Sequence, residues 1–340
     1  MESLAVKTTG DVAWPLAHRA GRAGTTVPVR DVEIGGREFV VIAGPCSVET
    51  REQIDQIAGR VGCAGAALFR AGAFKPRTSP YAFQGLGAEG LAMLAEAVSP
   101  ALPVVTEALD AEQLERVAGT ADVVQIGARN MHNTSLLCAA AACGRPVLLK
   151  RGFAATIDEL LLAAEYLLAH GNPHVLLCER GIRTFERATR NTADLASVAL
   201  LKRLTHLPVL VDPSHATGRA DLVAPVAHAA LAVGADGVMI EVHHQPARSW
   251  SDADQAIDCD AFDDLMRSLA VRAPLFGRTM RSAVGADAGA LRQCRDVIEG
   301  IDEALVALLS ERDKMARAAD SIARRLATGH ATDREEVSRD

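Results

Sequence analysis

Short apolar runs alternate along the chain with longer segments in which apolar residues recur every three to four positions. Between residue 38 and about residue 242 this alternation occurs eight times. The runs are FVVIAGPC (39–46), ALFRAGAF (67–74), LPVVTEAL (102–109), DVVQIGA (122–128), PVLLKRG (146–152), HVLLCERG (174–181), PVLVDPSH (208–215) and GVMIEVHH (237–244). Apolar runs of this length predict buried strands, and the amphipathic segments between them, such as IDELLLAAEYLLAHGN, predict helices.

Eight successive strand and helix units predict an α/β fold in which parallel strands close into a (β/α)8 barrel, known as a TIM barrel. The alternative is a doubly wound open sheet, which usually has fewer strands and a glycine-rich nucleotide-binding turn after the first strand. The first run is not followed by a GxGxxG sequence. We therefore predict a catalytic barrel over residues 38–271.

The segments that flank the barrel have different patterns. Residues 1–37 predict an N-terminal arm, with a small hairpin in VPVRDVEIGGREF whose turn we assign to the Ile-Gly-Gly sequence. Residues 272–289 are rich in glycine and alanine and predict a linker. Residues 290–340 predict a C-terminal helical extension, with apolar positions at 291, 298, 301, 305, 308, 309 and 315. A helix with one apolar stripe needs a partner surface, which is the barrel, a second copy or helices that this chain lacks.

Composition supports the α/β class and excludes several kinds of partner. Hydrophobic residues make up 49% of the chain and aromatic residues only 4%, which is more typical of helices packed on a parallel sheet than of a β-sandwich. The net charge of −7 is spread along the chain, so we expect no nucleic-acid or membrane partner. Seven cysteines without a CxxC pair, and no apolar leader or membrane span, predict a soluble, unprocessed, cytoplasmic protein.

The C-terminal ends of the predicted strands carry a set of metal-binding side chains. In a (β/α)8 barrel the active site lies at these ends, where we find Cys46, His215, Glu241 and, further on, Asp252. Thiolate, imidazole and carboxylate together suit a divalent transition metal such as manganese, iron, cobalt or zinc. The alternative is that Cys46 is a small buried apolar residue and that His215 is a hydrogen-bonded core residue.

Cationic side chains gather at the same strand ends. They are Arg70, Lys75, Arg77, Arg129, Lys150 and Arg180. Buried cations are costly unless they bind anions or form ion pairs, so this set predicts substrates with phosphate and carboxylate groups. Structural ion pairs with Glu107, Glu179 and Asp212 are the alternative for some of them. The sequence KPRTSPYAFQG (75–85) adds Thr78 and Ser79, which suits a rigid loop that presents hydroxyls and cations to a phosphate.

Several of these sequences closely resemble one family. AGPCSVE, RAGAFKPRTSPYAFQGLG, QIGARNMHN, CERGIRTFE, VDPSHATGR and GADGVMIEVH are similar to motifs of type I beta 3-deoxy-D-arabino-heptulosonate 7-phosphate (DAHP) synthases, over roughly residues 39–257. These enzymes catalyse the first step of the shikimate pathway of aromatic amino acid biosynthesis. A related enzyme that makes 3-deoxy-octulosonate 8-phosphate typically has a KANRSS-like sequence in place of KPRTS. The resemblance therefore implies erythrose 4-phosphate as the aldose.

The resemblance also implies a role for each residue of the site. Cys46, His215, Glu241 and Asp252 match the metal ligands, with Mn²⁺ favoured and Fe²⁺, Co²⁺ or Zn²⁺ as alternatives. Arg70, Lys75, Arg129, Lys150 and Arg180 match residues that hold phosphoenolpyruvate, and Arg77, Thr78 and Ser79 match the erythrose 4-phosphate loop. The implied reaction is an aldol-like condensation in which the metal polarises the aldehyde and Lys75 protonates the new hydroxyl.

Two departures from the family pattern leave a second function open. The chain has ARNMHNT, with His132 and Thr134, where the family reads like ARNMQNF, and the loop EVHHQPARSWSDADQAI differs from the common EVHPNP form. Both are expected near the rim of the barrel. The first alternative function is therefore condensation of phosphoenolpyruvate with another aldose in specialised metabolism. A non-catalytic barrel that regulates a chorismate mutase through residues 290–340 is a separate alternative.

The C-terminal segment resembles the first helix of an all-α chorismate mutase. Arg295 and Arg312 match two substrate-binding arginines, and DREE (333–336) resembles the start of the second helix. The lysine expected late in the first helix aligns with Ala323, and the remaining helices are not found. We therefore expect no chorismate mutase activity and predict a role in oligomerisation or in feedback regulation by an aromatic-pathway ligand, with simple docking as the alternative. The expected assembly is a homodimer or a homotetramer.

Overall fold

The computed structural model describes residues 12–77, 79–98, 101–282 and 287–336, and the side chains of the last helix over residues 298–324. The predicted hairpin is present, since β1 (Val27–Val29) pairs with β2 (Val32–Ile34) in antiparallel register. Its turn is formed by Arg30 and Asp31, so the assignment to Ile-Gly-Gly was wrong. Arg30 adopts the left-handed conformation with φ of 53°. Gly35 serves a different need, because a Cβ atom there would lie 2.4 Å from the Thr25 carbonyl oxygen.

Eight parallel strands form a closed barrel, which confirms the predicted fold. The strands are β3 (Val40–Gly44), β4 (Leu68–Arg70), β5 (Val104–Ala108), β6 (Val123–Ile126), β7 (Val147–Lys150), β8 (Val175–Glu179), β9 (Val209–Val211) and β10 (Gly237–Glu241). Each strand pairs with the next along the chain, and β10 pairs with both β9 and β3. This closure excludes the open doubly wound sheet.

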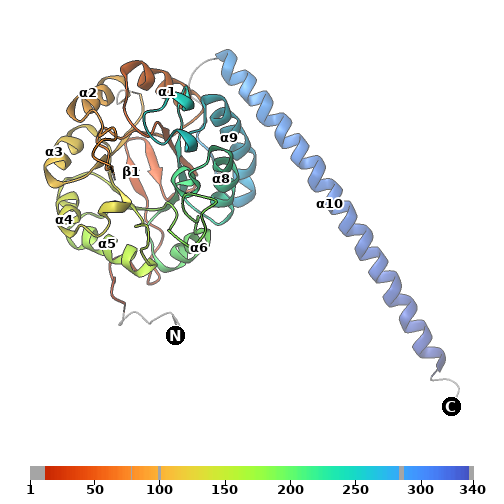
Figure 1. Cartoon of the computed structure of the whole chain (residues 1–340). Helices are drawn as coiled ribbons and strands as arrows, with labels where there is room; N and C mark the ends of the chain where they lie inside the picture. Colours follow the sequence, from red (N-terminus) through yellow and green to blue (C-terminus); the bar gives the residue numbers. More distant parts are fainter. Residues whose placement is uncertain (1–11, 78, 99–100, 283–286, 337–340) are drawn as a thin grey trace. The chain divides into compact units, whose positions relative to one another are not determined.

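Helices surround the barrel (Figure 1). They are α1 (Arg51–Cys63), α2 (Ala88–Ala97), α3 (Ala111–Thr120), α4 (Thr134–Ala142), α5 (Ile157–Ala169), α6 (Leu195–Leu204), α7 (Pro213–Thr217), α8 (Val223–Ala232) and α9 (Cys259–Arg272), with short 3₁₀ helices η1 (Ala128–Asn130), η2 (Ala220–Leu222), η3 (Pro246–Arg248), η4 (Ala253–Gln255) and η5 (Ala273–Phe276). Several begin at the side-chain caps that their sequences offer. Thr156 and Glu159 form a capping box that begins α5, and Asp110 caps α3.

The hairpin closes one end of the barrel, and the opposite end stays open to a candidate active site. Its buried residues Val27, Val29, Val32 and Ile34 belong to the same apolar cluster as barrel residues such as Leu148. A separate and larger cluster lies between the strands and the surrounding helices. Figure 1 shows β1 within the ring of strands. The polar strand ends predicted to carry the site therefore lie at the end of the barrel that the hairpin does not fill.

The chain divides into two compact units, Met1–Gly285 and Ala286–Asp340. The described part of the second unit is one helix, α10 (Asp287–Glu336), of 50 residues. DREE continues this helix, so the second helix expected to start there is not formed in the described residues. Arg295 lies outside the side chains that the structure describes. Apolar side chains are exposed along α10 and include Ile298, Ile301, Leu305, Leu308 and Met315. Among the described residues, no helix is long and apolar enough to cross a membrane.

Candidate active site

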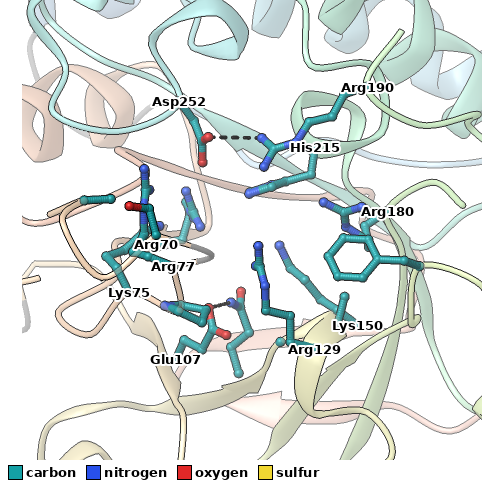
Figure 2. A pocket seen from close by; sticks show the side chains of 17 residues that line it. Arg70, Lys75, Arg77, Glu107, Arg129, Lys150, Arg180, Arg190, His215 and Asp252 are labelled. Atoms are coloured by element: carbon teal, nitrogen blue, oxygen red, sulfur yellow. Dashed lines mark hydrogen bonds and ion pairs between the residues drawn. The ribbon is translucent and has the colours of Figure 1, made fainter. Parts of the chain in front are cut away.

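A cavity of about 300 Å³ lies at the C-terminal ends of the strands (Figure 2). Its lining contains nearly every residue that the strand ends predicted, together with several others. The charged and polar lining residues are Arg70, Lys75, Arg77, Ser79, Glu107, Gln125, Arg129, Lys150, Arg180, Arg190, His215 and Asp252. Thr78 lies outside the described residues. The barrel thus brings the predicted cations and two of the predicted metal ligands to one cavity.

The four predicted metal ligands form one cluster. The candidate ligand atoms of Cys46, His215, Glu241 and Asp252 all lie within 4.8 Å of one another. They come from the loop after β3, the start of α7, the end of β10 and the residue before η4. A compact set of one sulfur, one imidazole nitrogen and two carboxylates fits a divalent transition metal. The structure therefore supports a metal site in preference to the reading of Cys46 and His215 as ordinary core residues.

His215 is held in the orientation that a metal ligand needs. Its Nδ1 lies 2.7 Å from Asp212 Oδ2, and its backbone N–H donates to Asp212 Oδ1 at 2.9 Å. The Nδ1–H tautomer leaves Nε2 free to bind a metal, and Nε2 faces Glu241 Oε1 at 3.4 Å. Burial lowers the pKa of His215 and outweighs the opposing effect of the Asp212 and Glu241 charges. The imidazole is thus neutral at neutral pH, as metal binding requires.

Cys46 and Lys75 form a buried pair beside the other ligands. Lys75 Nζ donates to Cys46 Sγ at 2.8 Å, and Cys46 Sγ lies 3.1 Å from Asp252 Oδ2. Burial raises the pKa of Cys46 to about 12, with a further contribution from the Glu241 charge. Burial lowers the pKa of Lys75, but the contact with the Cys46 sulfur and the charge of Glu241 outweigh it and raise the pKa overall. Lys75 is therefore an ammonium ion that can give up a proton inside the cavity.

Both carboxylate ligands are paired with cations. Glu241 Oε1 accepts a hydrogen bond from Arg70 at 2.7 Å, and Asp252 Oδ1 accepts one from Arg190 at 3.1 Å (Figure 2). Gln255 links the two groups, since it donates to Glu241 Oε2 and accepts from Arg190, each at 2.7 Å. Burial raises the pKa of Asp252, but the charge of Arg190 outweighs it and holds the pKa well below its usual value. Both ligands are thus ionised at neutral pH.

Four cations of the cavity lack a carboxylate partner among the described residues, and one of them, Lys75, contacts Cys46 instead. Arg77, Arg129 and Arg180 form no ion pair there, and Nη1 of the buried Arg180 has no hydrogen-bond partner. Burial lowers the pKa of Arg180, and the Asp212 charge only partly offsets this. The guanidiniums of Arg180 and Arg129 lie 4.8 and 5.4 Å from the centre of the Phe153 ring. A buried guanidinium with a free donor, held open to a cavity, is suited to bind an anion.

Ion pairing within the protein explains only part of the cationic set. Lys150 lies 2.5 Å from Asp212, and Arg70 pairs with Glu241. Glu179 pairs instead with Arg151, which does not line the cavity. Glu107 accepts a hydrogen bond from Gln125 at 3.0 Å. The alternative of structural ion pairs with Glu107, Glu179 and Asp212 thus holds for Lys150, whereas Arg70 pairs with the predicted metal ligand Glu241.

Sequence reasoning missed Arg190 and Phe153. Arg190 lies well beyond the end of β8, whereas the prediction used only the last residues of each strand. Phe153 had a weak signal, because it is an aromatic residue next to the cations that follow β7. The two departing residues of ARNMHNT, His132 and Thr134, are exposed and do not line the cavity.

Comparisons with known proteins identify the family of the chain. A family model described as the DAHP synthetase I family matches residues 17–272. A phospho-2-dehydro-3-deoxyheptonate aldolase from Thermotoga maritima is 50% identical over 254 residues, which are 74% of this chain and 75% of the relative. A 2-dehydro-3-deoxyphosphooctonate aldolase from a Bradyrhizobium species is 35% identical over 271 residues, 74% of this chain and 94% of the relative. A crystal structure of the Thermotoga maritima enzyme, with 48% identity, has a TM-score of 0.77 and covers 79% of each chain.

Proposed function

Because the chain belongs to the DAHP synthetase I family, we propose that its barrel condenses phosphoenolpyruvate with erythrose 4-phosphate to give DAHP and inorganic phosphate. The chain is then a transferase, a 3-deoxy-7-phosphoheptulonate synthase, which acts at the first step of the shikimate pathway. The observation that carries the proposal is the convergence of two sets of residues. Four metal ligands and four cations without carboxylate partners among the described residues meet at one barrel end.

Cys46, His215, Glu241 and Asp252 would hold the metal ion. Mn²⁺ is the favoured ion, and Fe²⁺, Co²⁺ and Zn²⁺ suit the same donors. When bound, the ion supplies Lewis acidity that polarises the aldehyde of erythrose 4-phosphate. The proposal is supported by the Nδ1 contact of His215 with Asp212, which leaves Nε2 free for the metal.

Arg129, Lys150 and Arg180 would bind the phosphate and carboxylate of phosphoenolpyruvate, with Arg70 beside them. The unpartnered Nη1 of Arg180 supports this role, because an incoming anion would satisfy it. Arg70 also has a buried Nε without a partner, in addition to its bond to Glu241. Holding two polyanions together requires this excess of positive charge, and positioning should account for much of the rate enhancement.

The loop after β4 would bind the aldose. Arg77 and Ser79 line the cavity and would contact the phosphate of erythrose 4-phosphate, as would Thr78, which lies outside the described residues. C3 of phosphoenolpyruvate attacks the aldehyde carbon, and the developing alkoxide takes a proton from the ammonium of Lys75. The position of Lys75 Nζ, 2.8 Å from Cys46 Sγ, supports this role. Water then adds at C2, and phosphate leaves.

Substitution of the metal ligands tests this function. Cys46→Ala and His215→Ala should each abolish metal-dependent phosphate release, and chelation should do the same to the unchanged protein. The exposed residue Thr134 provides a matched control, and Thr134→Ala should retain full activity. Full activity of either ligand variant, or activity that survives chelation, would overturn the proposal. Release with another aldose phosphate but not with erythrose 4-phosphate would favour a synthase for another aldose, and no release with any aldose phosphate would favour a non-catalytic partner of a chorismate mutase.

We also propose that α10 contributes to assembly or regulation rather than to chorismate mutase catalysis. The exposed apolar side chains on α10 support a docking role. A homodimer or homotetramer and feedback by an aromatic-pathway ligand remain proposals, as does a cytoplasmic location.

A further inference from the structure

The predicted metal ligand Asp252 has a backbone conformation that is uncommon for residues other than glycine. Asp252 has φ of 52° and ψ of 40°, which is the left-handed region. A residue other than glycine stays in that region only when its surroundings hold it there. The residues around Asp252 should therefore contain the contacts that hold it.

Those contacts come from the segment after β3, which also carries Cys46. The carboxylate of Glu49 is buried and binds three groups of the Asp252 loop. Its Oε1 accepts hydrogen bonds from the Trp250 backbone N–H at 2.9 Å and from the Ser249 hydroxyl at 3.2 Å. Its Oε2 lies 3.4 Å from Nε2 of His243, which is the second residue after β10. One carboxylate thus fastens both ends of the loop between β10 and η4.

Ser47 completes the connection. Its hydroxyl lies 2.7 Å from the hydroxyl of Ser251 and 3.2 Å from Glu49 Oε1. Residues 249, 250 and 251, which immediately precede Asp252, are therefore each bound by Ser47 or Glu49. Glu49 is in turn held by Gln53 in α1, whose side chain accepts from the Glu49 N–H at 3.0 Å and donates to the Ser47 carbonyl at 3.2 Å. The loop is fixed to a helix of the barrel wall.

We propose that Glu49 is a positioning residue that holds Asp252 in place as a metal ligand. This inference rests on the proposed metal-dependent function. Without Glu49, the loop loses the bonds that oppose relaxation of Asp252 from its left-handed conformation. The ion pair with Arg190, at 3.1 Å, would then draw the carboxylate away from Cys46. The metal would lose one of its four ligands.

The fastened loop also touches the substrate loop, which provides a spectroscopic signal. The Trp250 ring packs edge-on against Phe83, with centroids 5.0 Å apart. The chain has two tryptophans, Trp14 and Trp250, so Trp14→Phe leaves Trp250 as the only one. The fluorescence of Trp250 then reports on the loop that carries Asp252.

The test measures metal affinity without substrates in the full chain carrying Trp14→Phe. Cd²⁺ is titrated by Trp250 fluorescence, and Co²⁺ by its thiolate charge-transfer band, which reports Cys46. Glu49→Ala should weaken Cd²⁺ binding about 10- to 100-fold, as is typical when a group behind a metal ligand is removed. The Co²⁺ band should persist at saturating metal. Glu49→Gln keeps an oxygen acceptor for the Trp250 N–H and should recover most of the affinity.

Two further variants separate positioning from a general loss of stability. Asp236→Ala removes a buried carboxylate at the other end of β10, where it binds Arg278 and Lys202, and should lower stability without changing the Cd²⁺ affinity. In an Asp252→Ala background, Glu49→Ala should weaken Cd²⁺ binding little further, because the two residues act together. Unchanged affinity in Glu49→Ala, or additive losses in the double variant, would overturn the inference. Failure of the Trp14→Phe protein with Glu49 intact to bind either metal would instead overturn the proposed function.

Discussion

At the scale of single residues, charges that would be costly elsewhere define the active site. Arg180 is buried and has no carboxylate partner among the described residues, and its ring contact with Phe153 keeps the guanidinium in place without neutralising it. Asp212 acts differently, because it binds both His215 and Lys150 and so fixes one metal ligand and one cation. The site thus combines cations that are available to bind a substrate anion with cations that already form ion pairs within the protein.

Arg180 should be essential for binding phosphoenolpyruvate. Arg180→Ala should reduce kcat/KM by about 10²- to 10³-fold, the typical cost of losing one charge-stabilising donor. The loss should appear in the affinity for phosphoenolpyruvate measured by calorimetry. Arg183 is a matched control, since it also lies 4.8 Å from the Phe153 ring but does not line the cavity. Comparable losses in Arg183→Ala and Arg180→Ala would contradict the assignment.

Metal binding should release about one proton near pH 8. Burial raises the pKa of Cys46 to about 12, so the metal-free thiol is protonated and must lose its proton. The lowered pKa values of His215, Glu241 and Asp252 mean that these ligands are already deprotonated. Affinity should therefore rise about tenfold per pH unit over this range. Calorimetry in buffers of different ionisation enthalpy measures the release, and an affinity independent of pH would contradict the prediction.

At the scale of elements, site residues on regular strands could be predicted from the sequence, whereas the geometry of the loops could not. The C-terminal ends of parallel strands lie at one end of the barrel, so residues such as Lys150 and Glu241 could be assigned to the site from the apolar runs alone. Loop geometry depends on contacts between distant segments, and no local pattern encodes it. The bond from Glu49 to Trp250 and the position of Arg190 therefore became apparent only in the structure. The hairpin turn was misassigned for the same reason, because a close approach to Thr25, rather than a turn, requires Gly35.

The helix α10 should mediate association of the chain with itself. Ile301 and Leu305 are 43% and 51% exposed, so Ile301→Asp with Leu305→Asp should reduce the mass measured by light scattering. Glu303 is exposed between them, and Glu303→Ala should leave the mass unchanged. Phosphate release per barrel should persist in both variants, because the site residues lie in the other unit. An unchanged mass in the double variant would count against a role in assembly.

At the scale of the whole molecule, the barrel separates stability from chemistry. The hairpin fills one end with apolar side chains, while the opposite strand ends carry charges that a packed core would exclude. The loops at that end supply both the metal ligands and the aldose loop. We therefore expect the choice of aldose to depend on loops such as residues 75–85, since a relative named 2-dehydro-3-deoxyphosphooctonate aldolase is 35% identical to this chain.

The most direct test of the central claim is phosphate release from phosphoenolpyruvate in the presence of different aldose phosphates, with and without metal. With Mn²⁺, erythrose 4-phosphate should support release at least about tenfold more efficiently than its one-carbon-longer homologue arabinose 5-phosphate. Chelation should abolish the reaction, and re-addition of metal should restore it. Faster release with the five-carbon sugar, or no release with erythrose 4-phosphate after loading with each of the four metals, would contradict the account.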